Sequence, residues 1–192
     1  MRLILGSSST NRIEILKEAG YVFDIVVPTL EEKLVKNTDP YQRPLILAHA
    51  KADELAVLVE EPALIITADT IVMWGDELCE KPETKEEARH FLMKTRSNSV
   101  PETVTAIVIT DTISGRRYEG VDITKSFFKP LPDEVIEDFI ENGDPYSRAG
   151  AIAIQHPILK PYFERIEGRY ESVLGMPIHL VTQLLEEAGY KP

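Results

Sequence analysis

The stretch Leu64-Ile65-Ile66-Thr67-Ala68-Asp69-Thr70 gives the clearest indication of the fold. Its first five residues form an almost continuous apolar run, which is typical of a strand buried on both faces of a sheet. The run ends at Asp69, which we expect at the carboxyl end of that strand. A hairpin is predicted next, with Thr70–Trp74 and Leu78–Glu80 pairing across Gly75-Asp76.

On both sides of this stretch, Val- and Ile-rich segments alternate with segments of helical periodicity, which favours an α/β or α+β fold. Further strands are predicted at Arg2–Gly6, Tyr21–Pro28, Val104–Thr110, Arg117–Phe128, Ala149–Ile154 and Tyr162–Ile166. Helices are predicted at Asn11–Ala19, Pro44–Val59, Thr84–Lys94, Pro132–Glu141 and Pro177–Ala188. Thr84 and Glu87 have the spacing of a capping box. No linker rich in Pro, Gly or Ser divides the chain, so we expect one domain over residues 1–192, in which Val104–Phe128 could build a second lobe.

Charge and cysteine usage restrict the function classes. The formal net charge is −11, and a uniformly acidic surface repels nucleic acid polymers, so we expect no polymer partner. A small anionic substrate would need a local cluster of cations, a metal ion, or both. The apolar stretch at the N-terminus is too short for a signal peptide or a membrane span, so we expect a cytoplasmic protein without a membrane partner. Cys79 is the single cysteine, which excludes an internal disulfide, and we interpret it as a packing residue.

The loop Gly6-Ser7-Ser8-Ser9-Thr10-Asn11-Arg12 is the first candidate site. Small hydroxyl residues at a helix N-terminus let backbone N–H groups approach a phosphate, and Arg12 could pair with a phosphate oxygen. Ser7, Ser9 and Arg12 are therefore candidate substrate-binding residues. The competing interpretation is an ordinary Ser-rich helix cap with a solvated arginine. No Walker motif occurs in the chain.

Carboxylates form the second group of candidates. Asp69 could hold a metal ion or accept a proton from water, and a turn-capping aspartate is the plainer alternative. In Glu31-Glu32-Lys33, a glutamate could ligate Mg²⁺ or Mn²⁺, although a solvated charged loop would have the same sequence. The four histidines lack the spacing of a zinc site.

The remaining candidates are two lysines and an amide. Lys51 lies among alanines in a predicted helix, and Lys81 precedes Pro82. Together they could neutralise a triphosphate, although most lysines are surface residues. Gln155 follows the predicted strand Ala149–Ile154, and its amide could pair with the edge of a base.

Taken in order, these motifs resemble the Maf family from Leu3 to about Leu185. The similarity lies in the series Ser9-x-x-Arg12, Glu31-Glu32-Lys33, Lys51-Ala52, Ala68-Asp69-Thr70, Glu80-Lys81-Pro82, Ala149-Gly150, Gln155 and Gly175-Met176-Pro177. Each motif is weak by itself, and the specificity comes from their combination.

The resemblance implies a nucleoside triphosphate pyrophosphatase with an inosine-triphosphatase-like α/β fold. It implies an elongated twisted mixed sheet with flanking helices, a deep cleft between two lobes, and a divalent cation (Mg²⁺ or Mn²⁺) as cofactor. The aspartate matching Asp69 is then the general base or a metal ligand with Glu32. Residues matching Ser9, Arg12, Lys51 and Lys81 line the phosphate site. Thr70 and Gln155 match the branch that acts on dTTP and UTP rather than on 7-methyl-GTP.

The chain also departs from the family pattern. Ser97-Asn98-Ser99-Val100-Pro101 stands where a Ser-Gly-Arg-x-His turn is usual, and Ser147-Arg148 stands where Asp-Lys is usual. His156-Pro157-Ile158-Leu159 replaces a Gly-rich segment. These changes bear on the choice of base more than on the type of reaction. The alternative from another class is a non-catalytic nucleotide-binding regulator of septum formation, which would not need Asp69. The oligomeric state is left open, with a homodimer as one option.

Overall fold

The computed structural model describes residues 1–30 and 39–191. Its strands are β1 (Arg2–Gly6), β2 (Asp24–Ile25), β3 (Ala63–Trp74), β4 (Glu77–Cys79), β5 (Pro101–Asp111), β6 (Arg117–Phe128) and β7 (Phe163–Glu167). Its α-helices are α1 (Thr10–Glu18), α2 (Arg43–Leu58), α3 (Lys85–Met93), α4 (Asp133–Asn142), α5 (Tyr170–Val173) and α6 (Ile178–Glu187). No helix in these two ranges is both long and apolar enough to cross a membrane.

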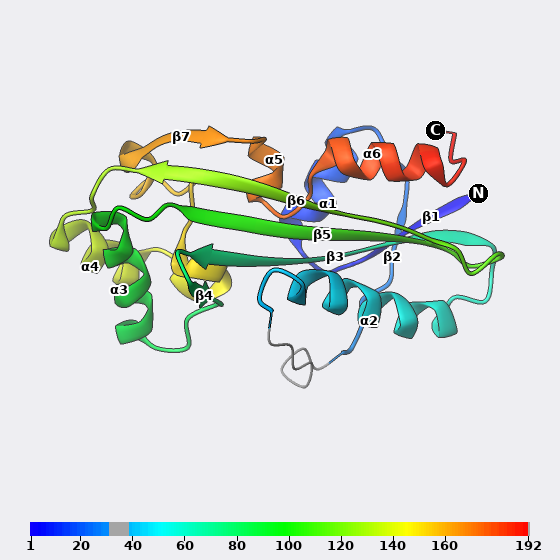
Figure 1. Ribbon diagram of the computed structural model, residues 1–192, viewed down its shortest axis with the longest axis horizontal. Helices are drawn as coiled ribbons and strands as arrows, with labels where there is room; N and C mark the ends of the chain where they lie inside the picture. The colour runs from blue at the N-terminus through cyan, green and yellow to red at the C-terminus, as the bar shows by residue number, and fades with distance from the viewer. Residues whose placement is uncertain (31–38, 192) are drawn as a thin grey trace. The chain divides into compact units, whose positions relative to one another are not determined.

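The described strands form one seven-stranded sheet in the order β2-β1-β3-β5-β6-β7, with β4 paired to β3 (Figure 1). The sheet is mixed, because β1 pairs in parallel with β2 and β3, whereas β4 and β7 pair in antiparallel fashion with β3 and β6. The predicted α/β fold with a mixed sheet and flanking helices is therefore confirmed.

The chain forms two compact units. The first unit comprises the described residues of Met1–Thr70, Val104–Asp122 and Tyr170–Pro192, and the second unit comprises Ile71–Thr103 and Ile123–Arg169. The predictions of a single domain over residues 1–192 and of a deep cleft are not tested by this division and stay predictions.

In the first unit, helices cover both faces of the sheet (Figure 1). Successive side chains of a strand point to opposite faces. In β3, Leu64 and Ile66 pack in a cluster with Leu16 of α1 and Leu184 of α6. The alternate residue Ile65 packs with Leu55 of α2. Helices α1 and α6 thus pack on one face of the sheet, and α2 packs on the opposite face.

The second unit has its own core. Trp74 of β3 and Cys79 of β4 are buried with Phe91 of α3 and Phe139 of α4. Burial raises the pKa of the Cys79 thiol to about 12, which agrees with its interpretation as a packing residue rather than a nucleophile. Thr84 caps α3 by accepting a hydrogen bond from the Glu87 N–H at 3.1 Å. The Glu87 carboxylate accepts from the Glu83 N–H rather than from that of Thr84, so half of the predicted capping box is present.

Two predicted strands are wrong in extent or type. Tyr21–Pro28 contributes only Asp24–Ile25, and the Tyr21 N–H belongs to the cap of α1, where it donates to the Leu16 carbonyl at 3.1 Å. Ala149–Ile154 is not a strand but begins with a short 3-10 helix, Ala149–Ala151. Gly150 and Ala151 have φ values of 65° and 56°, and two successive left-handed residues cannot continue a strand. The short helix α5 was not predicted.

Asp69 also lies elsewhere in its strand than predicted. The predicted strands Leu64–Ala68 and Thr70–Trp74 are one continuous strand, β3, and Asp69 lies inside it instead of at its end. A charged residue within a buried strand is tolerated when its charge is paired, and Asp69 is paired, as described below.

Candidate functional site

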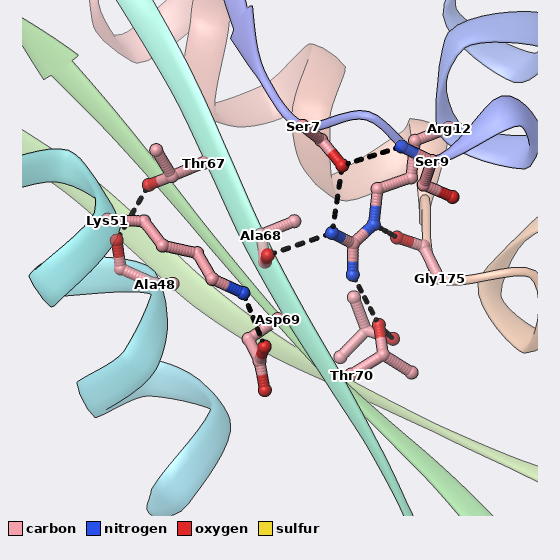
Figure 2. A network of polar contacts seen from close by, with 11 residues as sticks. Ser7, Ser9, Arg12, Ala48, Lys51, Thr67, Ala68, Asp69, Thr70 and Gly175 are labelled. Atoms are coloured by element: carbon pink, nitrogen blue, oxygen red, sulfur yellow. Dashed lines mark hydrogen bonds and ion pairs between the residues drawn. The ribbon is translucent and has the colours of Figure 1, made fainter. Parts of the chain in front are cut away.

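Hydrogen bonds of the Arg12 guanidinium connect four segments of the first unit (Figure 2). Its Nε donates to the Gly175 carbonyl at 3.0 Å, and Nη1 donates to the Ala68 carbonyl at 2.9 Å. Nη1 also reaches the Ser7 hydroxyl at 3.3 Å, and Nη2 donates to the Thr70 hydroxyl at 3.0 Å. Four of the five guanidinium N–H groups can be assigned to these acceptors. In the structure, Arg12 thus binds other parts of the same unit. Its contact with phosphate stays a prediction.

The place of Arg12 follows from the length of β1. The register between β1 and β3 ends with Gly6 opposite Thr67. Immediately beyond, Arg12 supplies the donor to the carbonyl of Ala68, where β1 no longer runs beside β3. A Cβ on Gly6 would lie 2.5 Å from Leu55 Cδ1, so the backbone approaches α2 too closely for a larger residue. The Ser-rich loop therefore begins at the carboxyl end of β1, the kind of position where parallel strands of α/β sheets bind ligands.

The Ser-rich loop itself is partly organised by side chains. The buried Ser7 hydroxyl accepts a hydrogen bond from the Ser9 N–H at 3.2 Å. Ser9 is the N-cap of α1, yet its side chain makes no capping hydrogen bond. The first turn of α1 also contains no acidic residue, so nothing there opposes an anion near the positive end of the helix dipole. Phosphate binding by this loop stays a prediction that these features favour.

Lys51 and Asp69 form a buried ion pair. Lys51 Nζ lies 2.7 Å from Asp69 Oδ1, and each side chain is only 9% exposed. Thr67 strengthens the same contact between α2 and β3 by donating to the Ala48 carbonyl at 2.8 Å. The burial of Lys51 contradicts the plain alternative of a surface lysine. It also explains how β3 can continue through Asp69.

The alternation of β3 places the two networks on opposite faces of the strand, as Figure 2 shows. Thr67 and Asp69 face α2, whereas Ala68 and Thr70 bond to Arg12 on the face covered by α1 and α6. The predicted site residues of the first unit thus form two groups. One is Ser7, Ser9, Arg12 and Thr70, and the other is Lys51 and Asp69.

Thr105 of β5 is a residue that sequence analysis missed. Its hydroxyl lies 3.0 Å from that of Thr70, and its side chain is buried. Gly175 closes the same network, because a Cβ there would lie 2.8 Å from Thr70 Oγ1, and its φ of +81° favours glycine. A threonine within the apolar stretch Val104–Thr110 was the available signal, but only tertiary packing shows its partner.

Lys81 and Gln155 belong to the second unit. Lys81 is exposed just after β4. Gln155 is exposed in a turn, so the prediction that it follows a strand is wrong, although its contact with a base is not tested. Their substrate-binding roles stay predictions.

Of the two predicted metal ligands, Asp69 and Glu32, only Asp69 lies among the described residues. Glu31, Glu32 and Lys33 lie outside the described residues. Within the described residues, no cluster of three or more His, Cys, Asp or Glu side chains could hold a metal ion. Asp69 offers carboxylate chemistry that suits Mg²⁺ or Mn²⁺, which often bind one or two protein carboxylates and complete their shells with substrate phosphates and water. Asp69 fits such a shared site, and the residues that the structure describes do not by themselves form a complete protein cage for the ion.

Comparison with known proteins identifies the family to which the chain belongs. The model of the family described as Maf-like protein matches residues 2–188. The dTTP/UTP pyrophosphatase of Alkaliphilus metalliredigens is 38% identical over 188 residues, covering 97% of this chain and 95% of the relative. The 7-methyl-GTP pyrophosphatase of Dictyostelium discoideum is 30% identical over 194 residues, covering 97% of each chain.

A solved structure is also similar at a lower level. The nucleoside-triphosphatase / dITP/XTP pyrophosphatase of Mycobacterium abscessus covers 98% of this chain and 95% of its own. The TM-score is 0.47 and the sequence identity is 12%, values at which a likeness alone decides neither fold nor activity.

Proposed function

The chain belongs to the Maf-like protein family, and we propose that it is a metal-dependent nucleoside triphosphate pyrophosphatase. The reaction is hydrolysis of a (deoxy)nucleoside triphosphate to the monophosphate and pyrophosphate. The name of the 38% identical Alkaliphilus metalliredigens relative supports this reaction. The observation that carries the proposal within this chain is the buried Lys51–Asp69 pair, at 2.7 Å.

The proposed chemistry uses this pair in two ways. A water oxygen bonds to the α-phosphorus, and the bond from that phosphorus to the bridging oxygen breaks, so that pyrophosphate leaves. Asp69 accepts the proton of the attacking water or holds the metal ion. The Lys51 ammonium, which already lies against Asp69, offers positive charge to the phosphates as negative charge moves onto the leaving group.

The other cations and the metal complete the proposed site. Lys81 and the backbone N–H groups after Ser9 bind phosphate oxygens in this proposal, with Ser7 and Arg12 holding the loop in place. Asp69 and Glu32 would hold the divalent cation, which when bound polarises the phosphate and neutralises its charge. Substrate positioning and electrostatic stabilisation then supply most of the rate enhancement.

For the base, we propose dTTP or UTP as substrate. Thr70 is small, and the exposed amide of Gln155 can both donate to and accept from the edge of a uracil-like ring. The relatives include both a dTTP/UTP and a 7-methyl-GTP pyrophosphatase, so the name of one relative does not decide the base.

The experiment is a substrate panel with product identification. The chain is incubated with dTTP, UTP, CTP and 7-methyl-GTP in Mg²⁺, in Mn²⁺ and in chelator. We expect pyrophosphate as the initial product, loss of turnover in chelator, and the highest kcat/KM with dTTP or UTP. Orthophosphate as the sole initial product would contradict the reaction, and full turnover in chelator would contradict the metal requirement.

The same panel tests the base contact. Gln155→Ala should lower kcat/KM for dTTP and UTP and leave folding unchanged, because the substituted side chain is exposed. Gln183→Ala, an exposed glutamine of α6, is the matched control. The base assignment is wrong if 7-methyl-GTP is the best substrate or if Gln155→Ala leaves ranking and rates unchanged.

A further inference from the structure

Arg148 stands out in the second unit because one N–H group of its guanidinium is buried without an acceptor among the described residues. The side chain is half-buried, and its Nε is buried with no hydrogen-bond partner within the described part of the chain. Arginine stays charged at all ordinary pH values, and a buried N–H without an acceptor destabilises the fold. An unoccupied guanidinium donor in this position therefore needs an explanation.

Three other arginines of the same unit have carboxylate acceptors. Arg89 pairs with Glu137. Arg96 Nη2 lies 2.5 Å from Asp133, and Arg165 Nη1 lies 2.5 Å from Glu167. The chain contains 32 acidic residues against 21 lysines and arginines, so carboxylate partners are plentiful. The missing acceptor of Arg148 Nε within the described residues is thus a local feature and does not reflect a shortage of carboxylates in the chain.

The backbone around Arg148 is held firmly beside the end of β4. The Gly150 N–H donates to the Glu80 carbonyl at 3.0 Å, and the Ala151 N–H donates back to the Arg148 carbonyl at 3.1 Å. A Cβ on Gly150 would lie 3.1 Å from Val72 Cγ1, so this segment packs closely on β3. Glu80 directly precedes Lys81. The cationic residues Arg148 and Lys81 therefore lie on adjoining segments of the second unit.

We propose that Arg148 is an oxyanion-binding residue which, with Lys81, binds the phosphate groups that become pyrophosphate. This inference rests on the proposed function for the identity of the anion. A guanidinium offers several N–H donors in a plane that matches two oxygens of a phosphate group, and the ammonium of Lys81 adds a second charge. The bound oxyanion supplies the acceptor that Arg148 Nε lacks among the described residues.

The test measures binding of inorganic pyrophosphate to the full chain by titration calorimetry, with and without Mg²⁺. Arg148→Gln should weaken binding by about 10- to 100-fold, the effect of losing hydrogen bonds to a charged group. Arg148→Lys, which keeps the charge and loses the fork, should fall between Arg148→Gln and the unchanged chain. Arg89→Gln is the matched control, because Arg89 is an exposed arginine with a carboxylate partner, and it should leave binding unchanged.

Binding by Arg148→Gln within twofold of the unchanged chain would overturn the proposal, as would an equal loss in Arg89→Gln. If Arg148→Gln fails to fold, the Nε–H resonance of Arg148 in the unchanged chain decides by NMR. Pyrophosphate should shift that resonance at the concentrations that saturate the calorimetric signal, and an unmoved resonance would contradict the assignment. The readout is independent of turnover. Turnover that releases only orthophosphate would defeat the proposed function. Undiminished pyrophosphate binding in Arg148→Gln, or no pyrophosphate binding by the unchanged and active chain, would defeat only the role of Arg148.

Discussion

The two faces of β3 differ in the partners that their charged side chains have. On the face toward α2, Asp69 and Lys51 concentrate two full charges in one buried contact of 2.7 Å. On the face toward α1, the single charge of Arg12 is spread over two carbonyls and two hydroxyls. Charged groups held in place can stabilise the charge that develops during a reaction, whereas distributed hydrogen bonds hold segments in position. The difference agrees with the proposed chemistry at the Asp69 face and with a role in loop organisation for the Arg12 face.

Asp69→Asn should have the largest effect on activity. The amide is nearly isosteric but can neither accept the proton of water nor ligate a metal as a carboxylate does. We expect kcat to fall by about 10²- to 10⁴-fold while the circular dichroism spectrum is retained. Asp76→Asn, in the exposed turn before β4, is the control and should keep full activity. Near-normal kcat in folded Asp69→Asn would remove the chemistry from this face.

Lys51→Met should have the largest effect on stability. It leaves the Asp69 carboxylate buried without its lysine, and removing one partner of a buried ion pair costs about 3–5 kcal/mol. The free energy of unfolding in urea measures this loss. The double variant Lys51→Met with Asp69→Leu should recover much of it, because both charges of the buried pair are then removed together. A double variant as unstable as Lys51→Met alone would show that the loss comes from packing and not from charge.

Gly175→Ala tests the organising face. The added Cβ meets Thr70 Oγ1 at 2.8 Å, and φ of +81° is unfavourable for alanine, so we expect a destabilisation of about 1–3 kcal/mol. Turnover should fall less than in Asp69→Asn. The control is Gly115→Ala, at a turn with φ of +70° and no atom within 4 Å of the added Cβ. Equal losses in both variants would mean that backbone strain alone, and not contact with Thr70, matters.

Thr105→Val should have the smallest effect. It removes the hydroxyl partner of Thr70 while keeping the side-chain shape, and a neutral hydrogen bond contributes about 1 kcal/mol. If Thr105 orients Thr70 for recognition of the base, the ratio of kcat/KM for dTTP to that for 7-methyl-GTP should change more than kcat for dTTP. An unchanged ratio with reduced stability would restrict Thr105 to a structural role.

Much of the fold could be predicted because its signals are local. The apolar periodicity of α2 and α6 and the turn residues Gly75 and Gly115 depend on neighbours within a few positions. The predicted strand at Ala149–Ile154 failed because Gly150 and Ala151 take left-handed conformations that composition does not announce. The strand predicted at Tyr21–Pro28 is limited to Asp24–Ile25, and its first residue caps α1 through a contact that the strand pattern does not contain.

By itself, the sequence determined the α/β class, the order of motifs that marks the family, and the candidate residues Lys51 and Asp69. Tertiary structure alone decided how those residues are combined. Lys51 is 18 positions from Asp69 in the chain, and its charge allows β3 to continue through a residue that was expected to end it. Once β3 is continuous, Asp69 and Thr70 must point to opposite faces, because side chains alternate along a strand. The division of the site into two networks therefore depends on a contact between distant residues, which no local pattern contains.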